Sequence, residues 1–137
     1  MRKITVVVCL DDKGGMTFLG KRQSRDRVLI GELIESTNGL IYISEFSLPL
    51  FKDYTTRCKV VENPLTDAPD GAVSFIENLP LLPVIDEVEE IMLYKWNRVY
   101  PADRKTDIPF NRYYVVRETS FVGSSHDKIS KVILRKR

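Results

Sequence analysis

Two polar tracts in this chain contain the side chains that could do chemistry. One spans residues 21–27 (KRQSRDR) and the other spans residues 95–98 (KWNR). Backbone N–H groups and the dipole at a helix start favour an anion, and an aromatic ring beside an arginine can stack on and clamp a flat ligand. We therefore predict a small-molecule site with the candidate ligand-binding residues Gln23, Arg25, Asp26, Arg27, Lys95, Trp96, Asn97 and Arg98.

Two of these residues have a structural as well as a functional interpretation. Asp26 either points into a cleft and anchors a protonated heterocycle, with Arg25 or Arg27 on an anionic group, or it lies in the first helical turn and complements the helix dipole. Trp96 either stacks on a ligand or covers the edge of a sheet. The sequence leaves both pairs of alternatives open.

The presence of a single histidine excludes several kinds of site. A metal centre built on several histidines is impossible, and the chain offers no cluster of carboxylates and cysteines that would replace them. Ser125, His126 and Asp127 resemble a catalytic triad written in a row, but adjacent residues cannot face one another in the geometry that a triad needs. We interpret them as a polar hairpin tip. The chain also lacks a Walker loop and a GxGxxG motif, so no residue is assigned a catalytic role.

Composition predicts one globular domain over residues 1–137. Hydrophobic residues make up 43% of the chain and charged residues 29%, and the net charge of +2 does not demand a nucleic-acid partner. Cys9 and Cys58 fit neither a disulfide framework nor a metal knuckle, which suits a reducing compartment. The apolar run at residues 4–10 is too short for export or for a membrane span. We therefore expect a cytoplasmic protein without a membrane partner, and the oligomeric state stays open.

The hydrophobic pattern predicts an α/β fold with a central mixed sheet flanked by helices. Ser24 is placed to cap a helix that ends at residues 37–39, a short helix covers residues 47–53, and residues 97–110 are predicted as loop. Strands are predicted at residues 4–10, 40–44, 59–61, 72–76 and 90–96, followed by an antiparallel C-terminal hairpin of residues 113–122 and 129–135.

This order of elements brings both polar tracts to one edge of the sheet. The first tract follows strand 4–10 through a glycine-containing loop, and the second directly follows strand 90–96. Ligands of open α/β sheets bind at the carboxyl ends of the strands. We therefore expect Asp26 and Arg98 to border the same cleft.

The C-terminal hairpin is expected to close the sheet. Alternating residues of strand 113–122 should face opposite sides, and Val132 and Leu134 should supply apolar partners across the hairpin. The basic residues at the end of the chain are expected to be a solvated strand end, with a patch for polyanions as the alternative.

The order of elements resembles a shortened dihydrofolate reductase. The resemblance rests on the segments ITVVVCLDDKGGM, the helix bearing Asp26, LIYISEFSLPLF, EEIMLYKWNRVY and the closing RETSFVGSSHDKISKVILRKR. The resemblance covers most of the chain and is one of layout. It implies a reductase-like sheet, and it places Asp26 near the acid with which that family binds a pterin.

The specific motifs of that family are replaced in this chain. Residues 17–19 (TFL) stand where the family has Leu-Pro-Trp, residues 44–45 (SE) stand where it has Gly-Arg, and residues 95–96 (KW) stand where it has Gly-Gly. A dinucleotide cannot approach the backbone closely without those glycines. The sequence therefore disfavours NADPH, and no cofactor is predicted.

Three tracts, GKRQSRDR, YKWNRVYPAD and GSSHDKI, also resemble a family of small bacterial proteins of uncharacterised function, some of which carry the label ribonuclease Z. Ribonuclease Z resembles the metallo-β-lactamases, whose two-zinc hydrolysis needs several histidines and aspartates. His126 is the only histidine here, so the chain is not a metal-dependent ribonuclease.

Three functional hypotheses remain. The first is an α/β protein whose cleft binds a small nucleotide-like or pterin-like ligand without an established reaction. The second is a divergent reductase with Asp26 as its polar anchor. The third is an interaction module whose exposed edge or basic hairpin binds a protein or, with less support from the charge, a nucleic acid.

Overall fold

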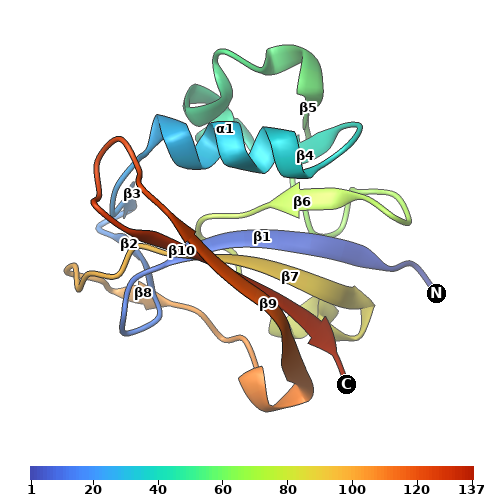
Figure 1. Cartoon of the computed structure of the whole chain (residues 1–137). Helices are drawn as coiled ribbons and strands as arrows, with labels where there is room; N and C mark the ends of the chain where they lie inside the picture. The colour runs from blue at the N-terminus through green and yellow to red at the C-terminus, as the bar shows by residue number, and fades with distance from the viewer.

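The computed structural model describes residues 1–137 and shows an α/β domain built on a seven-stranded mixed sheet (Figure 1). The first five strands in spatial order are parallel to one another, whereas the last two form an antiparallel hairpin whose inner strand pairs with the fifth. The spatial order is β5 (Cys58–Val60), β4 (Ile41–Ile43), β6 (Val73–Phe75), β1 (Ile4–Leu10), β7 (Val88–Lys95), β10 (Ile129–Lys136) and β9 (Tyr113–Phe121). The predicted fold class and C-terminal hairpin are confirmed.

Short elements complete the fold, and several of them have no sequence signal. One α-helix, α1 (Arg27–Ser36), is joined by the 3₁₀ helices η1 (Glu45–Phe51), η2 (Thr55–Arg57), η3 (Leu82–Glu87) and η4 (Phe110–Arg112). A second, small sheet has the order β3 (Lys21–Arg22), β2 (Gly15–Phe18), β8 (Arg104–Lys105). Strands of two residues are too short to show a period, so this sheet was missed within the predicted loops. No helix is long and apolar enough to cross a membrane.

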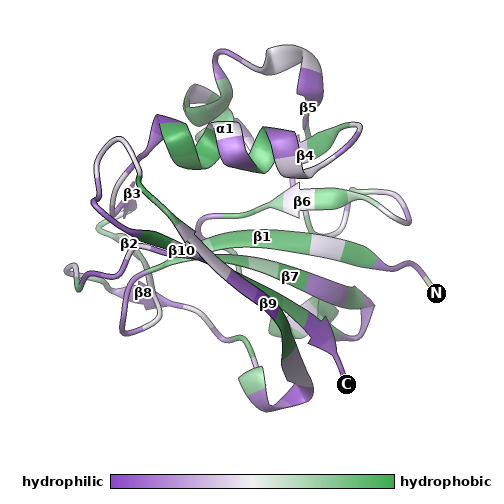
Figure 2. Ribbon diagram, viewed as in Figure 1, coloured by the Kyte–Doolittle hydropathy of each residue, from purple (hydrophilic) through white to green (hydrophobic).

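The sheet has a hydrophobic core on each face, because successive side chains of a strand point to opposite sides. Val7 packs on the face that α1 and η1 cover, together with Leu33 and Phe51. Val6 and Val8 pack on the other face, against η3 and the loops. Figure 2 shows this hydrophobic character along β1 and β7. Strands buried on both faces read as continuous apolar runs, which is why ITVVVCL was predicted correctly.

The N-cap of helix α1 lies two residues after Ser24, the residue expected to cap it. Asp26 is the N-cap: its backbone is extended and its carboxylate accepts hydrogen bonds from the backbone N–H groups of Val28 and Leu29. Aspartate and serine are both good caps. The sequence could not choose between them, and the contacts of the Asp26 side chain decide it.

Strand β9 differs from the expected two-faced strand. Its residues from Tyr114 to Ser120 are exposed whichever face they occupy, and Val115 is 58% exposed. The predicted alternation is interrupted, because a β-bulge pairs Val115 with Leu134 and Arg117 with Ile133, so Val115 and Arg117 do not share a face. The strand is exposed because it is the edge of the sheet. Val132 and Leu134 of β10 are buried as expected.

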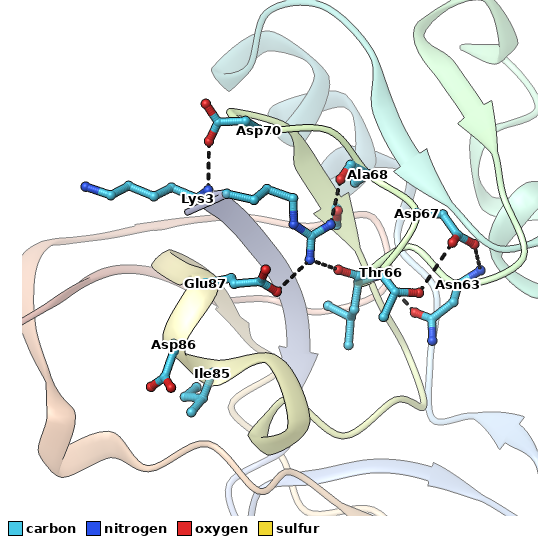
Figure 3. A network of polar contacts seen from close by, with 12 residues as sticks. Lys3, Asn63, Thr66, Asp67, Ala68, Asp70, Ile85, Asp86 and Glu87 are labelled. Atoms are coloured by element: carbon cyan, nitrogen blue, oxygen red, sulfur yellow. Dashed lines mark hydrogen bonds and ion pairs between the residues drawn. The ribbon is translucent and has the colours of Figure 1, made fainter.

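The amino end of β1 is tied to its surroundings by charged groups (Figure 3). The Arg2 guanidinium donates to the backbone oxygens of Leu65 and Ala68 and to the Glu87 carboxylate at 2.8 Å. The Lys3 backbone N–H donates to Asp70 at 2.7 Å. These contacts fix the end of the sheet that lies opposite the polar tracts.

Candidate functional site

The loop after β1 is organised by the buried side chain of Asp11. Its Oδ1 accepts hydrogen bonds from the backbone N–H of Lys13 and Gly15 at 2.8 and 2.7 Å. Its Oδ2 accepts from the Gln23 amide at 3.0 Å and from the Tyr100 backbone N–H at 3.1 Å. Burial alone would raise the pKa of Asp11, but these donors outweigh it and the pKa is lowered. The carboxylate thus positions Gln23 from the first predicted tract.

The start of α1 is organised in the same way by Asp26, which is 3% exposed. While Oδ1 caps the helix, Oδ2 accepts from the backbone N–H of Ser125 at 2.7 Å and from its hydroxyl at 2.8 Å. Burial opposes ionisation, but hydrogen bonds from the hairpin tip and from the helix hold the pKa of Asp26 well below its usual range. Four donors fill the accepting positions of a carboxylate, so in this structure Asp26 joins two elements of the protein.

The hairpin tip continues this network through His126, which is 5% exposed. Its Nδ1 lies 2.7 Å from Ser125 Oγ and its Nε2 lies 2.6 Å from the Tyr100 hydroxyl. The imidazole stacks on the Trp96 ring with centroids 4.8 Å apart. Figure 1 shows the loop between β9 and β10 beside the beginning of α1. Residues from the two polar tracts and the tip therefore meet at one place.

Ser125 and His126 are in contact, but the three consecutive residues do not form a triad. Ser125 Oγ bonds the near nitrogen of the adjacent ring, which a turn allows. Asp127, by contrast, is exposed and forms no hydrogen bond through its side chain. The carboxylate in contact with the serine is Asp26, 99 residues away, which no local pattern could indicate.

A cavity lies between these groups and the carboxyl ends of β1, β6 and β7; we call it the α1 cavity. It encloses about 20 Å³, enough for one water molecule. Eight of its fourteen lining residues are hydrophobic, which favours a flat organic ligand over an ion. The lining residues are Cys9, Met16, Arg22, Gln23, Ser24, Arg25, Asp26, Leu29, Ile30, Leu50, Phe75, Ile76, Glu77 and Trp96.

Two open hollows continue the α1 cavity outward along residues 20–25. The basic hollow has a volume of about 450 Å³ and is lined by Gly20, Lys21, Arg22, Ser24, Arg25 and Phe46. The tyrosine hollow has a volume of about 240 Å³ and is lined by Phe18, Leu19, Lys21, Arg22, Gln23, Tyr100 and Pro101.

The comparison with solved structures supports the fold expected from the sequence. The sequence matches no protein-family model and no curated protein. Among solved structures, the chain is similar to a dihydrofolate reductase from Enterococcus faecalis complexed with NADP(H) and RAB-propyl, with a TM-score of 0.67 and 10% sequence identity over 98% of this chain and 96% of that one. The chain has a dihydrofolate-reductase-like fold. Sequence identity at this level supports the fold alone.

Half of the predicted ligand-binding residues line the α1 cavity of this reductase-like fold. Gln23, Arg25, Asp26 and Trp96 do so. The other four, Arg27, Lys95, Asn97 and Arg98, do not. The Asn97 amide instead donates to the Lys128 backbone oxygen and to Ser130 Oγ. The positive charge of Arg98 acts on His126. Asp26 and Arg98 therefore both act on the hairpin tip, but only Asp26 reaches the cavity.

The sequence analysis missed an ion pair in the cavity wall. The Arg22 guanidinium bonds both oxygens of Glu77 at 2.8 and 3.0 Å, and Ser47 Oγ donates to the same carboxylate at 2.7 Å. The Arg22 guanidinium also lies 4.6 Å from the centre of the Phe46 ring. Glu77 directly follows the predicted strand 72–76, so its place at a carboxyl end was a usable signal.

Proposed function

We propose that this chain binds a small, flat, anionic ligand of nucleotide-like or pterin-like chemistry at the α1 cavity and its two hollows. The observation that carries the proposal is the Gln23 side chain. Its amide nitrogen is committed to Asp11, while its oxygen is buried without any hydrogen-bond partner. A buried acceptor without a donor is costly. An N–H group on a ligand ring would satisfy it.

The size of the cavity sets how such a ligand would lie. A free space of about 20 Å³ does not hold a ring, so the ligand would rest mainly in the hollows and insert one edge beside Gln23. Residues 20–25 form the boundary between cavity and hollows. Binding would therefore require this segment to move outward.

The charges around the mouth favour an anionic group on the ligand. Arg22 is neutralised by Glu77. Lys21 and Arg25 also line the basic hollow, are exposed and form no ion pair. Two free cations beside an aromatic ring, that of Phe46, suit a phosphate or carboxylate attached to a flat heterocycle.

The test is a titration of Trp96 fluorescence with AMP, GMP, pterin-6-carboxylate and folic acid. Trp96 is the only tryptophan and it lines the cavity, so its emission reports occupancy without a label. We expect at least one of these compounds to shift the emission and to raise the melting temperature, since a ligand at 100 times its Kd adds about 2.7 kcal/mol of stability. A panel without any response would refute the proposal.

Arg25 and Arg27 provide a matched pair of variants. Both are exposed arginines at the start of α1, but only Arg25 lines the cavity and the basic hollow. We expect Arg25→Gln to weaken binding about tenfold, the loss of one charge-assisted contact, and Arg27→Gln to leave it unchanged. Equal effects of the two substitutions would place the anionic group elsewhere.

We further propose that the ligand is not NADPH, although the fold implies that cofactor. A hollow at the carboxyl ends of β4 and β5 contains Glu45 and Glu62 and no basic residue. These carboxylates would repel a phosphate. At the end of β7, the buried ring of Trp96 stands where a dinucleotide would need glycine. We expect micromolar NADPH to leave Trp96 emission unchanged; quenching with a saturable dependence would bring back the divergent-reductase alternative.

The interaction-module alternative has one observation in its favour, the exposed apolar side chains of Tyr114, Val115 and Val116 on edge strand β9. The basic C-terminal strand supports it less. Lys131 pairs with Glu32 at 2.9 Å. The Lys136 ammonium donates to the backbone oxygens of Ile85 and Asp86 in η3. These cations stabilise the sheet. A gel-shift titration with short RNA at low salt tests the alternative directly.

A further inference from the structure

Four side chains form an unbroken line of hydrogen bonds between the tyrosine hollow and the start of α1. The Tyr100 hydroxyl lies 2.6 Å from His126 Nε2, and His126 Nδ1 lies 2.7 Å from Ser125 Oγ. Ser125 Oγ lies 2.8 Å from Asp26 Oδ2. Tyr100 lines the tyrosine hollow, and Asp26 lines the α1 cavity. The line therefore joins the two parts of the candidate site.

The charge of Asp26 fixes the direction of every hydrogen bond in this line. An ionised carboxylate only accepts, so the Ser125 hydroxyl must donate its proton to Asp26. The serine oxygen then accepts from His126, which places the ring proton on Nδ1. A neutral imidazole protonated at Nδ1 has a bare Nε2. That nitrogen accepts a hydrogen bond from the Tyr100 hydroxyl, and the Tyr100 oxygen keeps its capacity to accept one.

We propose that Tyr100 is a proton-transfer group for the ligand site, with His126 as its base and with Ser125 and Asp26 as positioning residues that fix the tautomer of the histidine. The arrangement follows the logic of a hydroxyl, a base and an orienting acid, with a phenol as the reacting group. Its partner would be a ligand with an acidic N–H or O–H, or with an electrophilic carbon, in the tyrosine hollow. The ligand part of this assignment rests on the proposed function; the reactivity of the phenol does not.

N-acetylimidazole is a probe for this reactivity that needs no natural ligand. The Tyr100 oxygen attacks the acetyl carbon, forming a C–O bond while the bond to the probe's imidazole breaks. His126 Nε2 takes the phenol proton, and the departing imidazole takes a proton from water. General-base assistance of this kind contributes on the order of 10² to 10⁴ in rate.

The groups that face His126 determine when it can act as a base. Burial and the positive charge of Arg98 lower the pKa of the ring, and the carboxylates of Asp26 and Asp127 oppose that shift. Tyr100 is the remaining titratable group in contact with it. The ring therefore stays neutral at neutral pH, and the reaction of Tyr100 should slow in acid as His126 takes up a proton.

The first test measures the tautomer by ¹⁵N NMR, in which the only histidine gives a single pair of ring signals. We expect protonated Nδ1 and bare Nε2 in the native protein. The Asp26→Asn variant keeps a good helix cap, but an amide nitrogen in place of Oδ2 would face the Ser125 backbone N–H as well as Ser125 Oγ. The Ser125 hydroxyl then loses its acceptor, and the ring proton is no longer held on Nδ1. A native protein protonated at Nε2 would overturn the proposal.

The second test compares the acetylation rates of two tyrosines by mass spectrometry. Tyr114 is 42% exposed on edge strand β9 and has no hydrogen-bonded base, so it is an internal control. We expect Tyr100 to react at least about tenfold faster at pH 8, with a rate that falls in acid. Ser125→Ala, which leaves the helix cap intact, should reduce this advantage several-fold, and His126→Gln should remove its pH dependence. Equal rates for Tyr100 and Tyr114 in the native protein would refute the assignment without touching the ligand proposal.

Discussion

Asp11 and Asp26 are two buried carboxylates that position residues of the same site by different contacts. The hydrogen bonds of Asp11 go to its own loop, to Gln23 twelve residues away and to the Tyr100 backbone. Asp26 accepts two hydrogen bonds from the start of its own helix and two from Ser125, 99 residues away. Both carboxylates therefore connect the first and last thirds of the chain, Asp11 through the loop after β7 and Asp26 through the tip of the C-terminal hairpin.

The two carboxylates depend on different elements. The partners of Asp11 lie in its own loop, at Gln23 and in the loop after β7. The contacts of Asp26 need the C-terminal hairpin to be in place. The site is therefore completed by the last element of the chain, and the two carboxylates should respond differently to changes in that hairpin.

Removing residues 127–137 should have the largest effect. It deletes β10, which pairs with both β7 and β9, and it exposes the cores on both faces of the sheet. We expect loss of cooperative unfolding and aggregation of the truncated chain, because β7 and β9 become unpaired edges. Circular dichroism melting and light scattering measure this. A truncated chain that stays monomeric and melts cooperatively would show that the Asp11 side folds without the hairpin.

Two glycine substitutions compare the carboxylates directly. A methyl group at Gly123 would overlap Asp26 Oδ2 and come within 2.6 Å of Ile129 Cδ1. At Gly15 it would come within 2.5 Å of the Gln23 amide, 2.7 Å of Asp11 Oδ2 and 2.8 Å of Ala102 Cβ. We expect each substitution to cost about 1–3 kcal/mol, the range for overpacking. Urea unfolding measures both.

Gly31→Ala is the control for these glycines. A methyl group there meets only the Tyr54 hydroxyl at 3.4 Å, and the position is inside α1. It should stabilise the protein by up to about 1 kcal/mol. If Gly123→Ala were as harmless, the contact between Asp26 and the hairpin tip would be looser than the structure shows.

The free energy of unfolding should fall in two steps as the pH is lowered. The pKa values of His126, Asp11 and Asp26 are all lowered by folding. A group whose folded pKa is depressed stabilises the protein above its unfolded pKa and loses that contribution as the pH falls towards the folded value. The free energy of unfolding should therefore begin to fall near pH 6.5 through His126 and again near pH 4 through the aspartates.

Single substitutions assign these two steps. His126→Gln should remove the upper step. Asp26→Asn should flatten the lower step more than Asp11→Asn does, since Asp26 has the larger pKa shift. Asp127→Asn, at an exposed carboxylate without hydrogen bonds, serves as the control. If the two aspartate variants flattened the lower step equally, the two carboxylates would contribute equally to the pH dependence of stability, contrary to this prediction.

The central strands and α1 were predictable because burial leaves a pattern along the chain. Segments such as ITVVVCL and IMLY are almost continuously apolar, since both of their faces are covered. The small sheet of β2, β3 and β8 was not predictable, because its strands GMTF, KR and RK contain no apolar run. The exposure of β9 was also hidden: its alternating residues resemble a half-buried strand, and only its place at the edge of the sheet leaves both faces open.

The sequence by itself determined the succession of strands and helix along the chain, the reductase-like layout and the two polar tracts. Hydrophobic periodicity and turn residues act over short distances, so a local pattern records them. The tertiary structure alone decided which polar residues meet. Asp26 and Gln23 come from one tract, but Asp26 bonds Ser125 and Gln23 bonds Asp11. The line from Ser125 continues through His126 to Tyr100, and no local pattern indicates these contacts. Hydrogen bonds between such distant residues depend on strand order and loop path, which emerge only when the whole sheet has formed.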